Sequence, residues 1–362
     1  MARIRPRSIK EGFKFFFKLF LTRVGLDEHD DPDLSHRFIE FDSRKDLMLF
    51  SRSVIKAERK DSDGKMTFLI KCKNEAFYIT LGYQSINMPS NVIPIDTSVG
   101  LFLLVVLERE IKINSYIDNL KILNEIIVPI ENEGNQNGYD LETILKYFPE
   151  INVFRLTEPI HDYSVMLDKL SIMMYCENRS LLRLNMPDNI VASYCSVINQ
   201  GFENINYDNL WRSVSSSEWR YCFIELYRCL EILFNISRTF DLSDKIRSKH
   251  NLSSLFSFSW KELRDYYHDD SMINFLFSQL SQEKLDMLKA IPSIKNASGL
   301  YKLRNSIVHG KRAIYYNSIT SKEKEWQSII FFAISAIEEL YSLYDNDLSN
   351  FDETVVNSNR RT

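Results

Sequence analysis

A short stretch near the C-terminal end of the chain combines residue types that could cut RNA. Residues 303–310 read LRNSIVHG, which places an arginine and an amide a few positions before a histidine. Arginine presents planar N–H donors to the oxygens of a phosphate. Histidine titrates near neutral pH and can take up or release a proton. We therefore predict that Arg304, Asn305 and His309 are catalytic, with Asn305 orienting the imidazole or binding a phosphate oxygen.

RNA carries its own nucleophile, the 2′-hydroxyl beside the scissile phosphate, so this chemistry requires no metal ion. Lys311 and Arg312 follow the stretch directly and are predicted to bind the substrate by attracting its backbone. The sequence contains no P-loop, GxGxxG, serine-elbow or HExxH motif. We accordingly expect no cofactor and no metal site.

A helix over residues 296–309 is predicted to position the three side chains, with Gly310 as the residue after its C-terminus. At about 3.6 residues per turn, several residues share one side of this helix. They are Leu300, Leu303, Ile307 and Gly310. Because this side is apolar, we predict that it faces the core.

Asn305 and His309 are four residues apart and therefore stack on the side opposite the core. Arg304 lies between the two sides and is long enough to reach His309. One helix cannot enclose a substrate, but a second copy of the same surface, packed across a two-fold axis, would form a cleft. We therefore predict a homodimer through the motif face, with RNA as the substrate.

Apolar residues at three- and four-residue spacings predict further helices in the last part of the chain. One is expected to begin near Trp219, one covers residues 271–288, and a long final helix starts at residue 320 or 321 and ends near residue 346. The helix near Trp219 carries Glu225 and Glu231. We expect both glutamates to be structural, one facing solvent and one pairing with a basic residue.

The segment from Arg304 to His309 resembles the Arg-polar-x-x-x-His motif of HEPN domains, the higher eukaryote and prokaryote nucleotide-binding family. The resemblance covers residues 205–347 and is nearest to the Apea-like HEPN ribonucleases of bacterial anti-phage and abortive-infection systems. It implies an antiparallel helical bundle, dimerisation through the motif face and metal-independent endoribonuclease activity. By this resemblance Arg304 and His309 are catalytic and Asn305 is their polar partner.

Residues 36–145 carry strand signals and are predicted to form an α+β domain with a sensor or regulatory role. Residues 53–58 and 66–71 are rich in strand formers and flank a polar turn, which predicts a hairpin. Residues 76–81 could be a third strand. Residues 99–111 form a long apolar run, and its periodicity does not distinguish a strand from a buried helix.

Four other segments complete the predicted organisation. Residues 1–35 form a basic amphipathic segment that either contacts anionic lipid or RNA or docks on its own domain. Residues 131–138 are polar, with two glycines, and are either a linker or a surface loop inside one domain. Residues 146–204 are predicted to be a helical connector, and residues 348–362 a flexible tail.

The predicted fold class is an α+β N-terminal domain followed by an all-α C-terminal HEPN-like antiparallel helical bundle. A length of 362 residues is sufficient for two domains. The net charge of −4 means that RNA binding must use local patches. The five cysteines form no CxxC pair, which indicates a reducing cytoplasm and no zinc site. No apolar run is long enough to predict a membrane span.

The predicted function is therefore a cytoplasmic, metal-independent endoribonuclease that acts as an effector of anti-phage defence. A regulatory partner or a phage trigger would act at the N-terminal domain. The alternative is a HEPN-fold module without catalysis, in which the same face binds a partner protein or a nucleotide.

Overall fold

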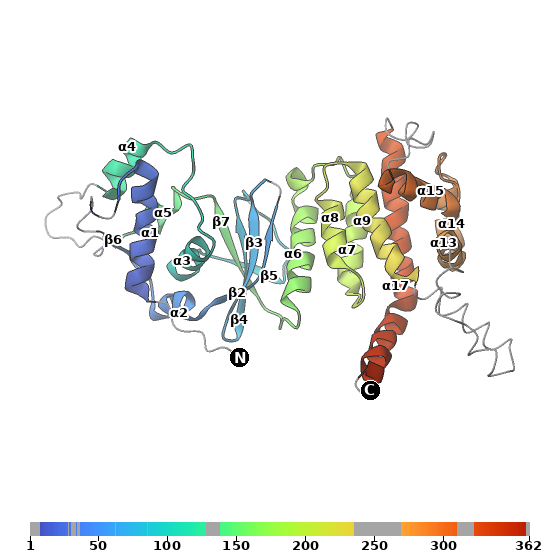
Figure 1. Ribbon diagram of the computed structural model, residues 1–362, viewed down its shortest axis with the longest axis horizontal. Helices are drawn as coiled ribbons and strands as arrows, with labels where there is room; N and C mark the ends of the chain where they lie inside the picture. The colour runs from blue at the N-terminus through green and yellow to red at the C-terminus, as the bar shows by residue number, and fades with distance from the viewer. Residues whose placement is uncertain are drawn as a thin grey trace. The chain divides into compact units, whose positions relative to one another are not determined.

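A computed structural model describes residues 8–27, 29, 34, 37–61, 63–84, 86–127, 138–234, 269–309 and 322–359. The chain is a mixed α/β protein that divides into two units, Met1–Leu167 and Asp168–Thr362. The boundary lies inside helix α6 (Tyr163–Glu177). In the described residues the sheets belong to the first unit, and the second unit is built from helices (Figure 1).

A five-stranded antiparallel sheet with the strand order β2-β3-β4-β7-β5 forms the centre of the first unit. The strands are β2 (Val54–Lys60), β3 (Met66–Cys72), β4 (Glu75–Leu81), β5 (Val92–Ile95) and β7 (Ile151–Leu156). Gly64 has a φ of 81° in the turn between β2 and β3, where its N–H donates to the Asp61 carbonyl at 3.0 Å. The predicted hairpin and the predicted third strand are therefore confirmed.

Strand β7 lies within the segment predicted to be a helical connector, residues 146–204. That prediction is wrong for residues 151–156, which form a strand between β4 and β5. Val153 and Phe154 point to opposite faces of the sheet, and both are buried. A short strand buried on both faces lacks the alternation that identifies strands, so its pattern resembles that of a helix. The first unit consequently extends beyond residue 145, to Leu167.

Helices α1 (Ile9–Val24), α2 (Arg44–Arg52) and α3 (Val99–Glu108) share one apolar core with one face of the sheet (Figure 1). The ring of Phe16 on α1 lies 5.6 Å from the ring of Phe102 on α3, between centroids. Within the basic N-terminal segment, docking on its own domain is therefore observed for α1. The apolar run at residues 99–111 is mainly helix.

A second, two-stranded sheet pairs β1 (Phe38–Ile39) in parallel with β6 (Gly138–Tyr139). Because β6 belongs to the first unit, residues 131–138 connect elements of one unit rather than two domains; apart from Gly138 they lie outside the described residues. The remaining elements of this unit are α4 (Asn119–Ile122), the π-helical turn η2 (Leu123–Ile127) and α5 (Leu141–Leu145).

Helix α17 (Glu323–Asn359) is the longest element of the second unit and packs against α7, α9 and α14. Helix α15 (Ala297–Val308) packs against α9 and α13, and α8 packs against α9. The other bounds are η3 (Arg179–Leu181), α7 (Asp188–Gln200), α8 (Tyr207–Val214), α9 (Trp219–Ile232), α13 (Asp269–Ser278) and α14 (Gln282–Lys289). Across the described residues, no helix has both the length and the apolar character needed to cross a bilayer.

Two helix predictions in the second unit require correction. The single helix predicted over residues 271–288 is in fact α13 and α14, with a break between them. At this break the backbone N–H of Ser281 donates to a carboxylate oxygen of Glu339 on α17 at 2.5 Å, so a contact from outside the segment fixes the turn. The final helix continues to Asn359, into the segment predicted to be a flexible tail (residues 348–362).

Glu110 follows α3 in the left-handed region of backbone space, with a φ of 48°. Around it the Ile111 N–H donates to the Val106 carbonyl at 3.0 Å, which closes the helix end. Glycine is the usual residue here, because a Cβ in this conformation costs about 1 kcal/mol. We therefore expect Glu110→Gly to raise the free energy of unfolding by about 1 kcal/mol, measured by urea denaturation.

The matched control is Glu108→Gly, which places the same glycine in the last turn of α3. It is expected to lower the free energy of unfolding by about 0.5–1 kcal/mol, because glycine loses more conformational freedom in a helix. A loss of stability for Glu110→Gly would contradict the assignment of strain to this position.

Candidate functional site

Helix α15 carries the predicted motif, and its first turn is held by a side-chain cap and by a close backbone contact. Asn296 caps the helix, since its Oδ1 accepts a hydrogen bond from the Gly299 N–H at 2.8 Å. A Cβ at Gly299 would come within 2.1 Å of the Ile294 carbonyl oxygen. Glycine therefore allows the close approach of backbone that seats the first turn. The helix predicted over residues 296–309 is confirmed with nearly the same bounds.

The buried side of α15 differs from the predicted one at its C-terminal end. It consists of Ala297, Gly299, Leu300, Leu303 and Ser306. Ile307 was predicted to face the core but is only half-buried, and Gly310 lies outside the described residues. The Ser306 hydroxyl donates to the Leu303 carbonyl at 2.7 Å, which satisfies its buried polar atom. The core side therefore turns toward Ser306 as the helix proceeds.

Arg304 joins α15 to α9 through an ion pair. Its Nη2 donates to Oε1 of Glu231 at 2.7 Å, and its Nη1 donates to Oδ1 of Asn305 at 2.9 Å. The Arg304 and Glu231 side chains are 22% and 29% exposed. The two acceptors hold the orientation of the guanidinium, while this partial exposure leaves it accessible to a substrate from solvent.

Helix α9 also supplies an aromatic ring to the same guanidinium. The guanidinium carbon of Arg304 lies 5.8 Å from the centroid of the Tyr227 ring, within the range of a cation–π attraction. Tyr227 and Glu231 are four residues apart on α9 and therefore point to the same side. Tyr227 was not among the predicted site residues. Its spacing from Glu231 is the sequence signal that could have identified it.

His309 forms the C-terminal cap of α15, and it is exposed. Its backbone N–H donates to the Asn305 carbonyl at 3.0 Å, so the two residues are stacked one turn apart, as the helical period predicted. Asn305 thus contacts Arg304 through its side chain and His309 through its backbone carbonyl. Lys311 and Arg312, predicted to bind the substrate, lie outside the described residues.

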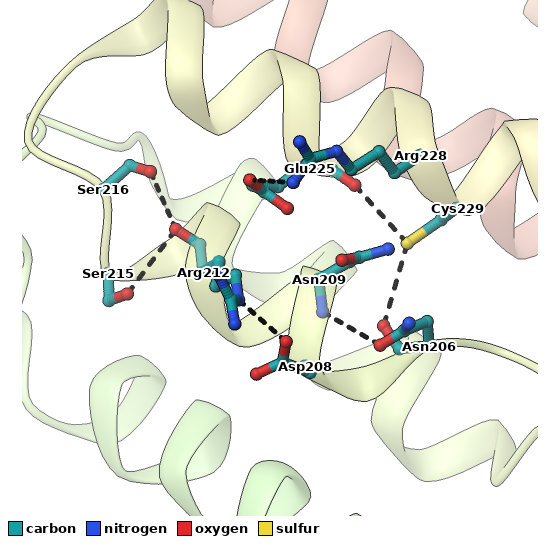
Figure 2. A network of polar contacts seen from close by, with 9 residues as sticks. All are labelled: Asn206, Asp208, Asn209, Arg212, Ser215, Ser216, Glu225, Arg228 and Cys229. Carbon is teal, nitrogen blue, oxygen red and sulfur yellow. Dashed lines mark hydrogen bonds and ion pairs between the residues drawn. The ribbon is translucent and has the colours of Figure 1, made fainter. Parts of the chain in front are cut away.

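Glu225, the other carboxylate of α9, belongs to a separate polar network near α8. Its Oε1 accepts from Nη1 of Arg228 at 2.7 Å, and Figure 2 shows this pair next to the pair formed by Asp208 and Arg212. The Oε2 atom of Glu225 is buried and makes no hydrogen bond to a described residue. Both glutamates pair with an arginine, Glu231 with Arg304 of the motif and Glu225 with Arg228, so the prediction that one of them faces solvent is wrong.

Among the described residues, no group of three or more His, Cys, Asp or Glu side chains is placed to hold a metal ion. Comparison with protein-family models, with curated proteins and with solved structures finds no match for this chain. The resemblance to HEPN domains over residues 205–347 therefore stays a hypothesis that rests on the motif and on the geometry of α9 and α15.

Two thiols of the second unit interact outside this site. Cys176 at the end of α6 and Cys195 on α7 form a side-chain hydrogen bond, and both are free cysteines. This hydrogen bond from the Cys176 thiol lowers the pKa of Cys195 to about 7. The same hydrogen bond, followed by burial, raises the pKa of Cys176. Cys195 is only half-buried, so its thiolate is within reach of a small reagent.

We expect iodoacetamide to modify Cys195 with a rate that rises with pH and reaches half of its maximum near pH 7. The thiolate is the reacting species, and an ordinary thiol would reach that point only near its pKa of about 8.5. Peptide mass spectrometry across the pH range measures the midpoint. In Cys176→Ala the donor is lost, and the midpoint should move upward; an unchanged midpoint would show that Cys176 does not stabilise the thiolate.

Proposed function

We propose that this chain is a metal-independent endoribonuclease of the HEPN type, acting in the cytoplasm as an effector of anti-phage defence. The observation that carries the proposal is the arrangement on α15, where Glu231 and Asn305 hold Arg304 five residues before the exposed His309. The packing of α15 and α17 on α9 supports a HEPN-like antiparallel bundle over residues 205–347. The first unit would carry the sensor or regulatory role.

The proposed reaction uses the 2′-hydroxyl of the RNA as the nucleophile. A base removes the hydroxyl proton, the oxygen attacks phosphorus, and the bond to the 5′-oxygen breaks as that oxygen takes up a proton. The products are a 2′,3′-cyclic phosphate and a 5′-hydroxyl end. His309 would carry out one of the two proton transfers, and Arg304 would stabilise the charge that develops on the phosphate oxygens.

The ion pair with Glu231 would keep Arg304 oriented between reactions. A partly exposed pair contributes at most about 1 kcal/mol, so a phosphate can compete with the carboxylate for the guanidinium donors. Glu231 would then act as a positioning residue, since it contacts Arg304 rather than the RNA. The ring of Tyr227 would keep the cation in place as its partner changes.

The two proton transfers favour a site that two chains build together. The two transfers occur at different atoms, the 2′-oxygen and the 5′-oxygen, and a second His309 across a two-fold axis would supply a group for the second transfer. His309 is exposed, and its neighbour Val308 is 50% exposed, so the end of α15 offers an apolar and polar surface to another copy.

We expect His309→Ala to lower the rate of RNA cleavage by about 100- to 10,000-fold, the usual contribution of a general acid or base. Purified full-length protein would be incubated with single-stranded RNA in EDTA, and cleavage read on a denaturing gel with analysis of the cyclic phosphate end. His161→Ala removes an exposed histidine of the first unit and should cleave like the wild type. Equal cleavage by wild type and His309→Ala would refute the assignment.

The defence role has a separate readout in bacterial cells. Cells that express the wild type should lose bulk RNA integrity and stop growing during phage infection, whereas cells that express His309→Ala should not. Loss of growth with intact RNA in both strains would exclude the ribonuclease as the cause.

The exposed Val308 also favours the alternative function, a HEPN-fold module that binds a partner protein or a nucleotide without cutting RNA. Dimerisation through the motif face predicts that Val308→Lys weakens self-association by at least about tenfold, because a two-fold interface receives the charge twice. Light scattering during size-exclusion chromatography measures the dimer. Leu120→Lys, at an exposed leucine of α4, is the matched control and should not change it.

Each outcome of this experiment separates the candidates. A dimer that dissociates in Val308→Lys and loses cleavage together with it supports the ribonuclease. A dimer that dissociates although no variant ever cleaved RNA supports the interaction module. A wild-type chain that is monomeric at all concentrations contradicts dimerisation through the motif face.

A further inference from the structure

A second candidate site lies in the first unit, on the side of α1 that does not enter the core. A cavity of about 770 Å³ is bounded by α1, the end of α3 and the segment that follows α3 as far as Ser115. This volume falls within the range of pockets that hold small molecules, which is about 300–1,000 Å³. All of the lining residues belong to the first unit.

Helix α1 lines this cavity with one continuous stripe of side chains, at spacings of three and four residues. The stripe consists of Phe15, Lys18, Leu19, Thr22 and Arg23. The opposite side of the helix buries its other phenylalanines in the core. Phe15 is 63% exposed, one turn before Leu19, so α1 presents an apolar surface that the described residues of its own unit do not cover.

The opposite wall is apolar as well. Val106 and Leu107 at the end of α3, together with Ile113, face the same cavity. Val106 and Ile113 are buried, and Leu107 is half-buried. The interior of the cavity therefore suits the apolar part of a ligand.

The charged side chains of the lining are mainly basic. Lys18, Arg23 and Lys112 contribute three cations, against the single carboxylate of Glu110. Arg23 donates through Nη2 to the Ser115 carbonyl at 3.0 Å, but its Nε is buried and makes no hydrogen bond to a described residue. A buried donor without an acceptor is rare in proteins, and an anionic ligand in this cavity would supply one.

We propose that this cavity binds a small amphipathic anion. The apolar chain or ring of the ligand lies along Phe15, Leu19 and Leu107, and its anionic head lies near Arg23 and Lys112. The charge complementarity selects an anion over a neutral or cationic ligand, and the apolar walls select one with a hydrocarbon body. This inference concerns the first unit alone and does not depend on the proposed ribonuclease activity.

Decanoate is a suitable probe, with binding to the full-length protein measured by titration calorimetry. Decanoate should bind about tenfold more tightly than decanol, which lacks the charge, and decylamine should bind no better than decanol. Shortening the chain should weaken binding about fourfold for each methylene removed. Equal affinity for decanoate, decanol and decylamine would overturn the charge assignment.

Two exposed substitutions should shift the affinity in opposite directions. Lys112→Gln removes a cation and should weaken decanoate binding about three- to tenfold, whereas Glu110→Gln removes the carboxylate and should tighten it about two- to threefold. Lys121→Gln, at an exposed lysine of α4 that does not line the cavity, should leave the affinity unchanged. Phe15→Ser should weaken binding of decanoate and decanol alike.

A membrane surface with anionic lipids would also present anionic head groups on hydrocarbon chains, so vesicle binding is measured separately. The protein should not sediment with vesicles of phosphatidylglycerol under conditions in which it binds decanoate. Sedimentation with these vesicles and no calorimetric binding of soluble decanoate would overturn the proposal. Absence of both would also overturn it.

Discussion

The burial of α9 is the constraint on which the second unit and its candidate site depend. The helix packs against α8, α15 and α17, and one of its sides is fully buried. Tyr341 on α17 donates a hydrogen bond to the Cys229 carbonyl at 3.0 Å, which fixes the two helices against each other. With that side fixed, Tyr227 and Glu231 are directed to Arg304. The apolar packing therefore decides where the polar contacts form.

Two arginines of this chain show how burial separates a structural cation from one that could do chemistry. Arg37 is 4% exposed, and its guanidinium donates to the Ile126 and Ile127 carbonyls and to the Tyr139 hydroxyl at 2.5–2.6 Å. Full burial with every acceptor inside the protein holds such a group permanently, because releasing it would leave a buried charge unpaired. Arg304 retains part of its exposure and can exchange its partners.

Local patterns were sufficient where one element contains the whole signal. The hairpin of β2 and β3 follows from strand formers around a polar turn, and α15 follows from its apolar spacing. Local patterns were insufficient where residues of another element determine the local structure. Strand β7 is buried on both faces and therefore lacks the alternation of apolar and polar residues. The break between α13 and α14 is stabilised by Glu339 from α17. Neither cause is visible within the segment itself.

The sequence by itself determined the candidate chemistry: Arg304, Asn305 and His309 follow from residue type, and the helical period determined that His309 projects outward. Only the tertiary structure decided which groups surround them. Glu231 precedes Arg304 by 73 positions and Tyr227 by more, and their approach depends on how α9 and α15 pack. The cavity beside α1 likewise arises only when α1 and α3 come together. Contacts between distant segments depend on the summed burial of whole helices, which no local pattern contains.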